Sequence, residues 1–293
     1  MDKKLVVFGS VNLDFMTNVS AHPVPGETVL GSDFSKLPGG KGANQALAAA
    51  QHVGDGAAVL MAGSVGEDEF AELALANLKH ADVDLHAVTR SRRETGVAFI
   101  TVAQSGENVI VVSPGANKDA NVSQLDAIVL ADGDVLLTQQ EIPLQEIWRA
   151  HAAARSAGCT VVHNAAPATS MNAEALAHID ILIVNETEAV TIGGLLDWDA
   201  DDPETVCRDV RASFGTAVIL TKGAEGAVLF DGDEAMRFPA KEVAVKDTTG
   251  AGDVFCGTLA AALVQQRPME SAVSDAIAAA SHACTMFGAQ NRL

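Results

Sequence analysis

Short apolar segments alternate with longer segments of helical periodicity along most of the chain, and this alternation restricts the possible folds more than any other feature. A β-α-β rhythm predicts a parallel sheet whose strands are joined by right-handed crossovers. Strands are predicted at residues 5–8, 59–62, 135–137, 160–164, 181–184 and 217–220, and helices at residues 44–52, 69–80, 144–157, 203–214, 254–264 and 271–286. We therefore expect an α/β fold with a central, mainly parallel sheet flanked by helices.

Other stretches predict a smaller sheet beside the main one. Residues 95–102 and 108–112 flank a turn at 104–107, which indicates an antiparallel hairpin. Together with residues 15–19 and 28–37, this hairpin would form a small antiparallel sheet suited to act as a lid. We interpret residues 1–293 as a single domain in which segments of about 15–37 and 95–113 form the lid. Residues 228–230 and 237–245 are predicted edge strands.

The composition predicts a globular protein of the cytoplasm. A chain of 293 residues, 48% of them hydrophobic, can bury a large core. No apolar run reaches the roughly 20 residues needed to span a bilayer, and the N-terminal apolar stretch is too short for a signal peptide. The four cysteines are scattered without a Cys-x-x-Cys pair, which argues against a zinc site or a disulfide framework.

The formal net charge of −19 disfavours nucleic acid and anionic membranes as partners. A polyanionic substrate such as ATP would need local positive charge. That charge could come from a divalent cation, from helix N-termini, and from lysines such as Lys41, Lys222 and Lys246.

Residues 247–253, Asp-Thr-Thr-Gly-Ala-Gly-Asp, form a turn of small residues that leads directly into an apolar helical segment. The first N–H groups of a helix have no intrahelical partner, and the glycines at 250 and 252 would let a phosphate approach them closely. The carboxylate of Asp253 would then serve as the base that takes a proton from an attacking hydroxyl. On this stretch alone, simple capping of the helix by Asp253 is an equally good interpretation.

A second glycine-rich turn, Gly39-Gly40-Lys41-Gly42, opens the helix predicted at 44–52. It is not a Walker A loop, because no Ser or Thr follows the lysine. Such a turn could hold hydroxyls or phosphate, or it could serve packing only. Earlier in the chain, Asn12 and Asp14 alternate with apolar residues, so both should point to one face, where they could bind sugar hydroxyls or act only in a turn.

Polar residues also follow the predicted strands. Glu141, Asn185 and Glu188 lie just beyond strand ends, and ligands bind at this edge of open α/β sheets. Asn185 and Glu188 could equally cap the helix that follows. A further glycine turn, residues 221–226, ends the strand predicted at 217–220.

Taken in order, these segments resemble the ribokinase-like carbohydrate kinase family, which also includes adenosine kinases and fructokinases. The resemblance covers essentially the whole chain. Its motifs are Gly-Ser-Val-Asn-Leu-Asp (9–14), Gly-Gly-Lys-Gly-Ala-Asn-Gln-Ala (39–46), Asn-Glu-Thr-Glu (185–188), Thr-Lys-Gly (221–223), Asp-Thr-Thr-Gly-Ala-Gly-Asp (247–253) and Gly-Ala-Gln (288–290).

The resemblance implies an ATP-dependent kinase for the primary hydroxyl of a sugar, with ribose as the expected substrate and ribose 5-phosphate as the product. It implies Asp253 as the catalytic base and the N–H groups of Gly250, Ala251 and Gly252 as the anion hole. The implied sugar site comprises Asn12, Asp14, Gly40, Lys41, Asn44, Glu141 and Asp253. The lid would also be a homodimer interface.

The resemblance further implies the positions that bind the nucleotide and metals. On the nucleotide side these are Asn185, Thr221, Lys222, Gly223, Ala224, Glu225, Gly226 and Gly252. Glu188, with Asn185, would organise Mg²⁺ through water and would also organise the phosphates. A K⁺ site would be formed by Asp247 and Thr249 with backbone carbonyls of Ala283, Met286 and Gly288.

The chain departs from the family pattern at two positions. Arg292 stands where a small hydroxyl residue would complete the K⁺ site, and Ile277 stands where Asn or His often lies near adenine. Activation by K⁺ and preference for adenine therefore stay open. So do two alternatives: a kinase for deoxyribose, fructose or a nucleoside, and a non-catalytic sugar or nucleotide sensor.

Overall fold

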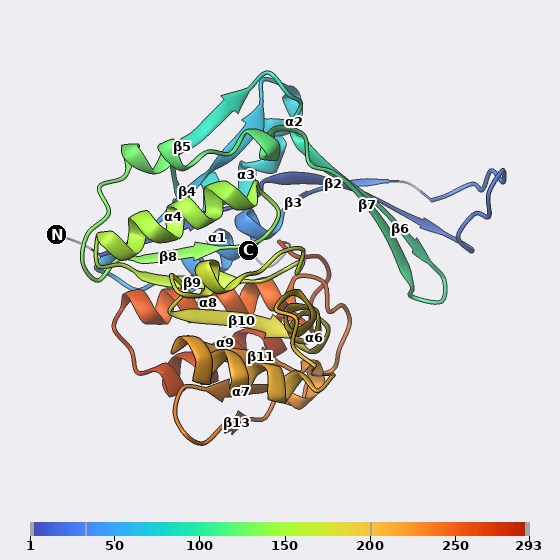
Figure 1. Cartoon of the computed structure of the whole chain (residues 1–293). Helices are drawn as coiled ribbons and strands as arrows, with labels where there is room; N and C mark the ends of the chain where they lie inside the picture. Colours follow the sequence, from blue (N-terminus) through green and yellow to red (C-terminus); the bar gives the residue numbers. More distant parts are fainter. Residues whose placement is uncertain (1–2, 33, 200, 291–293) are drawn as a thin grey trace.

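The computed structural model describes residues 3–32, 34–199 and 201–290 (Figure 1). Within these residues, nine strands form a central sheet in the order β13-β12-β11-β10-β9-β8-β1-β4-β5. The strands are β1 (Lys3–Phe8), β4 (Ala57–Gly66), β5 (Asp84–Ser91), β8 (Val135–Thr138), β9 (Thr160–Asn164), β10 (Ile181–Asn185), β11 (Ala217–Thr221), β12 (Ala227–Phe230) and β13 (Met236–Phe238). Every neighbouring pair from β5 to β11 is parallel, and β12 and β13 are antiparallel additions, so the predicted α/β fold is confirmed.

Helices cover both faces of this sheet, which is why its strands are apolar along their length. In β1, Leu5 and Val7 belong to the core on one face, and Val6 and Phe8 belong to the core on the other. The first face is covered by α1 (Lys41–His52), α2 (Glu69–Ala74), α3 (Ala76–His80), α8 (Ala251–Val264) and α9 (Met269–Ala283). The second is covered by α4 (Leu144–Ser156), α5 (Ala173–Leu176), α6 (Glu186–Leu195) and α7 (Pro203–Phe214).

A four-stranded lid sheet projects from the body (Figure 1), in the order β3-β2-β6-β7. Its strands are β2 (Asn12–Val19), β3 (Ser35–Gly39), β6 (Gly96–Ala103) and β7 (Asn108–Ser113). The predicted hairpin is confirmed as β6 and β7, which pair antiparallel, as do β2 and β3. The central pair, β2 and β6, is parallel, because β2 follows β1 and β6 follows β5 and both leave the parallel main sheet in the same direction.

Several predicted boundaries are wrong. The strand expected at 28–37 is regular only over Ser35–Gly39, where it pairs with β2, and Leu30 before it is 93% exposed. The strand expected at 237–245 ends at Phe238, because the exposed residues after it do not continue the pairing with β12.

Two further differences concern the segment between β4 and β6. The helix expected at 69–80 is interrupted at Leu75, which ends α2 and begins α3. The edge strand β5 was not predicted, because its sequence, Asp-Leu-His-Ala-Val-Thr-Arg-Ser, is too polar to stand out as a buried strand. In the residues that the structure describes, no helix is both long and apolar enough to cross a membrane.

Candidate active site

The first turns of α1 and α8 meet at the carboxyl edge of the central sheet. The hydrogen bond that joins them runs from Asn44 Nδ2 to Asp253 Oδ2, at 2.9 Å. Glu141 lies three residues after β8, and Asn185 is the last residue of β10, so both reach the same edge. The sheet topology thus brings together side chains that are more than 200 positions apart in the sequence.

Asp253 is buried in the first turn of α8, with 7% of its surface exposed. Each of its carboxylate oxygens accepts a hydrogen bond from a side-chain amide: Oδ2 from Asn44, and Oδ1 from Gln45 Nε2 at 3.0 Å. Because the first turn carries the positive end of the helix dipole, a carboxylate is favoured there. Two side-chain amides therefore hold the carboxylate of Asp253 in place.

The N-terminus of α8 is open toward an anion. Gly250 has a left-handed conformation, with φ of 70°, and no side chain caps the helix there. A Cβ atom at Gly252 would have no neighbour within 4 Å, so a ligand can approach this backbone closely. The N–H of Ala251 was expected in the anion hole, but in the structure it donates to the carbonyl of Thr248 at 3.1 Å.

Glu141 organises the N-terminus of α1. Its Oε2 accepts from the hydroxyl of Ser10 at 2.6 Å and from the backbone N–H of Lys41 at 3.1 Å. Gly40, the residue before α1, has no side chain to cap the helix, and the carboxylate of Glu141 takes this role from 100 residues away. Glu141 therefore positions the turn that carries Lys41.

Asn12 and Asp14 extend the same site onto the first lid strand. A Cβ atom at Gly39 would meet Asp14 Oδ2 at 2.3 Å, so only glycine on the neighbouring strand β3 leaves room for this carboxylate. Asn12 is buried, and its Oδ1 accepts from Asn117 Nδ2 at 2.7 Å. Asn117 also bonds the backbone N–H and C=O of Val11, so it fixes the start of the lid.

The site concentrates carboxylates around one lysine. Burial, with the nearby charges of Glu141 and Asp253, raises the pKa of Asp14 to about 7. The carboxylate of Asp253, followed by those of Glu141 and Glu188, raises the pKa of Lys41 despite its burial. Such a group of acceptors is suited to a ligand rich in hydroxyl donors.

The family model for pfkB family carbohydrate kinases matches residues 2–293. The chain belongs to this family.

Relatives within the family align along nearly the full chain. The ribokinase of Bacillus subtilis is 36% identical over 293 residues, covering 98% of this chain and 95% of the relative. The ribokinase structure of Thermotoga maritima superposes with a TM-score of 0.89 at 32% identity, covering 99% and 95% of the two chains. The structure of Arabidopsis thaliana ribokinase complexed with ribose and ATP has a TM-score of 0.85 at 29% identity, with the same coverage.

The expected nucleotide side of this kinase is built at the ends of β10 and β11. Thr221 ends β11, and a short 3₁₀ turn, Gly223–Glu225, follows it. The Lys222 ammonium lies 3.2 Å from Glu225 and 3.5 Å from Glu204, so its charge is already shared by two carboxylates. We therefore expect Lys222 to shape the turn more than to attract a phosphate.

Asn185 and Glu188 form a reciprocal cap at the start of α6. The side chain of Asn185 accepts from the N–H of Glu188 at 2.8 Å, and that of Glu188 accepts from the N–H of Asn185 at 2.9 Å. Burial raises the pKa of Glu188. The described residues contain no group of three His, Cys, Asp or Glu side chains that could hold a metal ion by themselves. One carboxylate and one amide fit Mg²⁺ that keeps its waters and is held largely by phosphates.

The residues expected around K⁺ lie where α9 ends. Asp247 Oδ1 accepts from the N–H of Thr249 at 2.9 Å, and its Oδ2 accepts from the N–H of Gly288 at 2.7 Å. The carbonyl of Ala283 accepts from the N–H of Met286 at 3.1 Å. The bond from Gly288 to Asp247 ties the segment after α9 to the loop before α8. Arg292 lies outside the described residues.

Sequence reasoning missed the polar residues that support the base. Gln45, Gln139 and Asn164 form a buried group behind Asp253, and Gln290 donates to Asn44 Oδ1 at 2.8 Å. Gln45 and Gln290 stood inside the motifs already noted, but nothing in the sequence indicated what they contact. Ile277, expected near adenine, is buried in the core of the α1 and α8 face.

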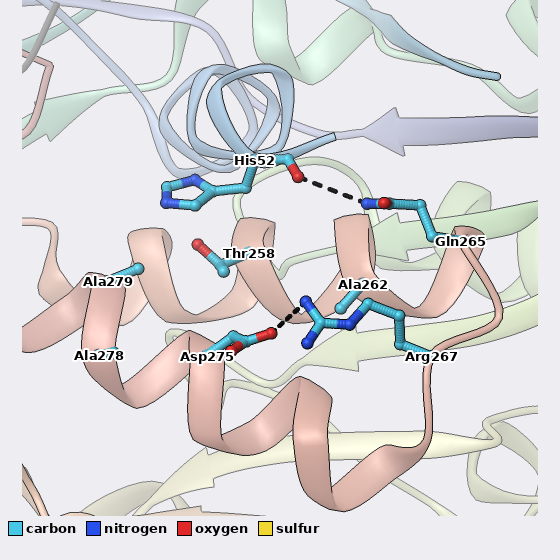
Figure 2. Close-up of a pocket in the computed structure, with 8 residues that line it drawn as sticks. All are labelled: His52, Thr258, Ala262, Gln265, Arg267, Asp275, Ala278 and Ala279. Carbon is cyan, nitrogen blue, oxygen red and sulfur yellow. Dashed lines mark hydrogen bonds and ion pairs between the residues drawn. The ribbon is translucent and has the colours of Figure 1, made fainter. Parts of the chain in front are cut away.

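A separate hollow lies further along the same two helices (Figure 2), lined by residues of α1, α8, α9 and the segment between α8 and α9. Its polar rim includes His52, Thr258 and an ion pair between Arg267 and Asp275. None of the predicted site residues lines it. It is therefore distinct from the site at the N-termini of α1 and α8.

Proposed function

We propose that this protein transfers the γ-phosphoryl group of ATP to the primary hydroxyl of D-ribose, giving ribose 5-phosphate. The observation that carries the proposal is the buried carboxylate of Asp253 at the open N-terminus of α8, held by Asn44 of the neighbouring glycine-rich turn. The ribokinase relatives along nearly the full chain support the choice of sugar.

In this proposal Asp253 accepts the proton of the attacking hydroxyl. The N–H groups of Gly250 and Gly252 face the transferring phosphoryl group and stabilise the charge that develops on it, and the N–H of Ala251 joins them once it leaves the carbonyl of Thr248. Phosphoryl transfer needs positioning and electrostatic stabilisation more than covalent participation, which fits a site made of one base and a helix N-terminus. Bound Mg²⁺ would neutralise phosphate charge.

The sugar would lie between the lid and the glycine-rich turn. Asp14 and Glu141 supply acceptors for its hydroxyls, and the proposed site is completed by Asn12, Gly40, Lys41 and Asn44. Asn12 is buried and Asp14 is half-buried, and a hydroxyl that misses its partner in such a site costs affinity.

The nucleotide and ions would occupy the opposite side of Asp253. We assign ATP to Asn185, Gly252 and the 221–226 turn, and Mg²⁺ to Glu188. We assign K⁺, as an activator, to Asp247, Thr249 and the carbonyls of Ala283, Met286 and Gly288. A cytoplasmic location fits the need for ATP. A homodimer through the lid completes the proposal.

The first test is steady-state ADP release with MgATP and either ribose, 2-deoxyribose, fructose, adenosine or no acceptor, each with K⁺ or with Na⁺. Ribose-selective turnover is expected. Selective turnover of another acceptor would support the proposed mechanism but identify that acceptor, and not ribose, as the substrate. Tight binding of sugar or ATP without any turnover would instead identify a sensor.

The second test is Asp253→Asn, which keeps the shape of the side chain and removes the base. We expect kcat to fall by about 10² or more, as for loss of a general base, with ribose binding retained in calorimetry. Asp126→Asn, at an exposed position outside the site, is the matched control. Near-wild-type kcat in a folded Asp253→Asn protein would show that another group takes the proton.

A further inference from the structure

Gln45 contacts the proposed base from the side opposite the solvent. Its side chain is fully buried on α1, and its Nε2 lies 3.0 Å from Asp253 Oδ1 and 3.1 Å from Asn164 Oδ1. Its Oε1 accepts from Gln139 Nε2 at 2.6 Å. These three hydrogen bonds of the amide are therefore with side chains of α8, of β9 and of the residue after β8.

These partners allow Gln45 only one orientation. Asn164 Nδ2 donates to the carbonyl of Ile183 at 3.3 Å, which turns the Asn164 oxygen toward Gln45. A flipped Gln45 amide would place its oxygen against both this oxygen and the carboxylate of Asp253, and its NH₂ group against the NH₂ group of Gln139. The donor aimed at Asp253 is thus set by the surrounding amides.

An amide is chemically suited to hold a base. It donates a hydrogen bond to the carboxylate, but it neither carries a charge nor gives up a proton near neutral pH. A lysine or arginine in the same place would favour the ionised carboxylate strongly and so weaken it as a proton acceptor. Two amides, Asn44 and Gln45, hold one oxygen each and leave the remaining lone pairs for a substrate hydroxyl.

The arrangement is not one that folding alone would favour. Gln139 is fully buried, and its Oε1 is among the buried polar atoms of the described residues that have no hydrogen-bond partner. This oxygen occupies the space left at Gly9, where a Cβ atom would lie 2.0 Å from it. A buried acceptor without a partner destabilises the fold, so Gln139 carries this cost beside the hydrogen bond that it donates to Gln45.

We propose that Gln45 is a positioning residue that aims the carboxylate of Asp253 at the substrate hydroxyl, and that Gln139 acts through Gln45. The inference rests on the proposed function, since it assigns Asp253 as the base. It predicts that both residues control kcat while contributing little to the binding of sugar or ATP.

The direct test is Gln45→Met in the full-length protein, which keeps the length of the side chain and removes both the donor and the acceptor. We expect kcat to fall about 10-fold to 100-fold, because a small misplacement of a catalytic group is sufficient for such a loss. KM for ribose and for ATP should stay within about threefold of the wild-type values, since the orientation of the Asp253 carboxylate affects proton transfer more than binding.

The matched control is Gln124→Met. Gln124 is also buried, and its amide bonds the backbone of β4 and β5 and the hydroxyl of Thr89, away from Asp253. Loss of this amide should lower the thermal midpoint without lowering kcat. An equal fall of kcat in both variants would mean that kcat only reports lost stability, and would overturn the proposal.

Two further variants test the chain of contacts. If Gln139 acts through Gln45, then the single variant Gln139→Met should have a lower kcat than the wild-type protein. The double variant should have the same kcat as Gln45→Met, because the second change causes no further loss. Gln45→Glu should regain activity as the pH is lowered, because only the protonated side chain can donate to Asp253. The assigned role would be contradicted if the losses of kcat in the two single variants add up in the double variant. It would also be contradicted if the activity of Gln45→Glu follows the same pH profile as that of the wild-type protein.

A crystal structure of Gln45→Met gives a readout besides activity, and a rotated Asp253 carboxylate is the expected result. Wild-type kcat in Gln45→Met, combined with the expected loss in Asp253→Asn, would overturn this inference alone. Absence of phosphotransfer in the wild-type protein would overturn the proposed function itself, whatever the crystal structure shows.

Discussion

At the scale of single residues, the Asp14 carboxylate lowers the stability of the fold while it supplies acceptors for the sugar hydroxyls. Its pKa of about 7 in the folded protein lies above the ordinary value of 3.8, mainly because of burial. Folding therefore takes up a proton between these pH values, and the contribution of Asp14 to stability falls as the pH rises from about 4 to about 7. Above pH 7 the negative charge on Asp14 lowers the free energy of unfolding.

Asp14→Asn should remove this cost. We expect the free energy of unfolding at pH 8 to rise by up to about 4 kcal/mol, since each pKa unit corresponds to about 1.4 kcal/mol. The gain should be small near pH 4, because the folded wild-type side chain is protonated there and the unfolded one is about half protonated. Urea denaturation at the two pH values measures this, and an equal gain at both would point to a cause other than charge.

The same carboxyl group should make sugar binding depend on pH. The ionised form accepts hydrogen bonds at both oxygens, whereas the protonated form loses acceptor capacity. We expect KM for ribose to rise as the pH falls through about 7 in the wild-type protein. In Asp14→Asn this dependence should disappear and KM should be high throughout, as steady-state kinetics from about pH 5.5 to about pH 8.5 would reveal.

At the scale of elements, the crossing of α1 and α8 sets the geometry of the base. Gly257 allows the crossing to be close: a Cβ atom there would lie 2.3 Å from the carbonyl oxygen of Gln45 and 2.8 Å from Ala48 Cβ. The carbonyl of Gln45 belongs to the same residue whose amide holds Asp253. The close packing of α1 against α8 therefore also places the residue that holds the base.

Gly257→Ala should therefore affect both stability and turnover. Overpacking at this crossing should lower the free energy of unfolding by about 1–3 kcal/mol, and displacement of α1 should lower kcat at temperatures where the protein is folded. Gly194→Ala on α6 is the control, because a Cβ atom there meets nothing within 4 Å. If Gly257→Ala is destabilised but keeps wild-type kcat, the site tolerates movement of α1.

At the scale of the whole molecule, the lid sheet leaves apolar side chains uncovered. One row across its strands includes Phe15, Phe99 and Val111, and Phe99 and Val111 are 54% and 61% exposed. Phe15 stacks with both Phe99 and Phe34, so the row continues as one apolar surface. A contiguous surface of this kind is typical of a subunit contact.

We therefore expect a dimer in which the lids cover each other. Sedimentation equilibrium should give about twice the chain mass of 30.2 kDa. Val111→Lys should shift the protein toward monomer and raise KM for ribose, because the lid carries Asp14 and Asn12. Val129→Lys, at a position 78% exposed outside the lid, should leave the dimer intact. A wild-type monomer would refute this assembly.

The layers of the fold and the main candidate residues could be predicted from local sequence patterns. Periodicity of apolar residues is a local property, so the strands of the central sheet and most helices could be predicted from windows of a few residues. The glycine turns before α1 and α8 and the carboxylate of Asp253 were recognisable because they are contiguous motifs. Weakly patterned edges such as β5 and β13 were missed or misplaced for the same reason.

The partners of the polar groups, in contrast, are set by tertiary packing. Glu141 caps α1 across 100 residues, Gln45 holds Asp253 across 208, and Gln290 reaches Asn44 across 246. No local pattern encodes such partners, because they depend on how every strand and helix between them packs. The residue types at the site follow from the sequence, but their orientation is a consequence of the assembled core.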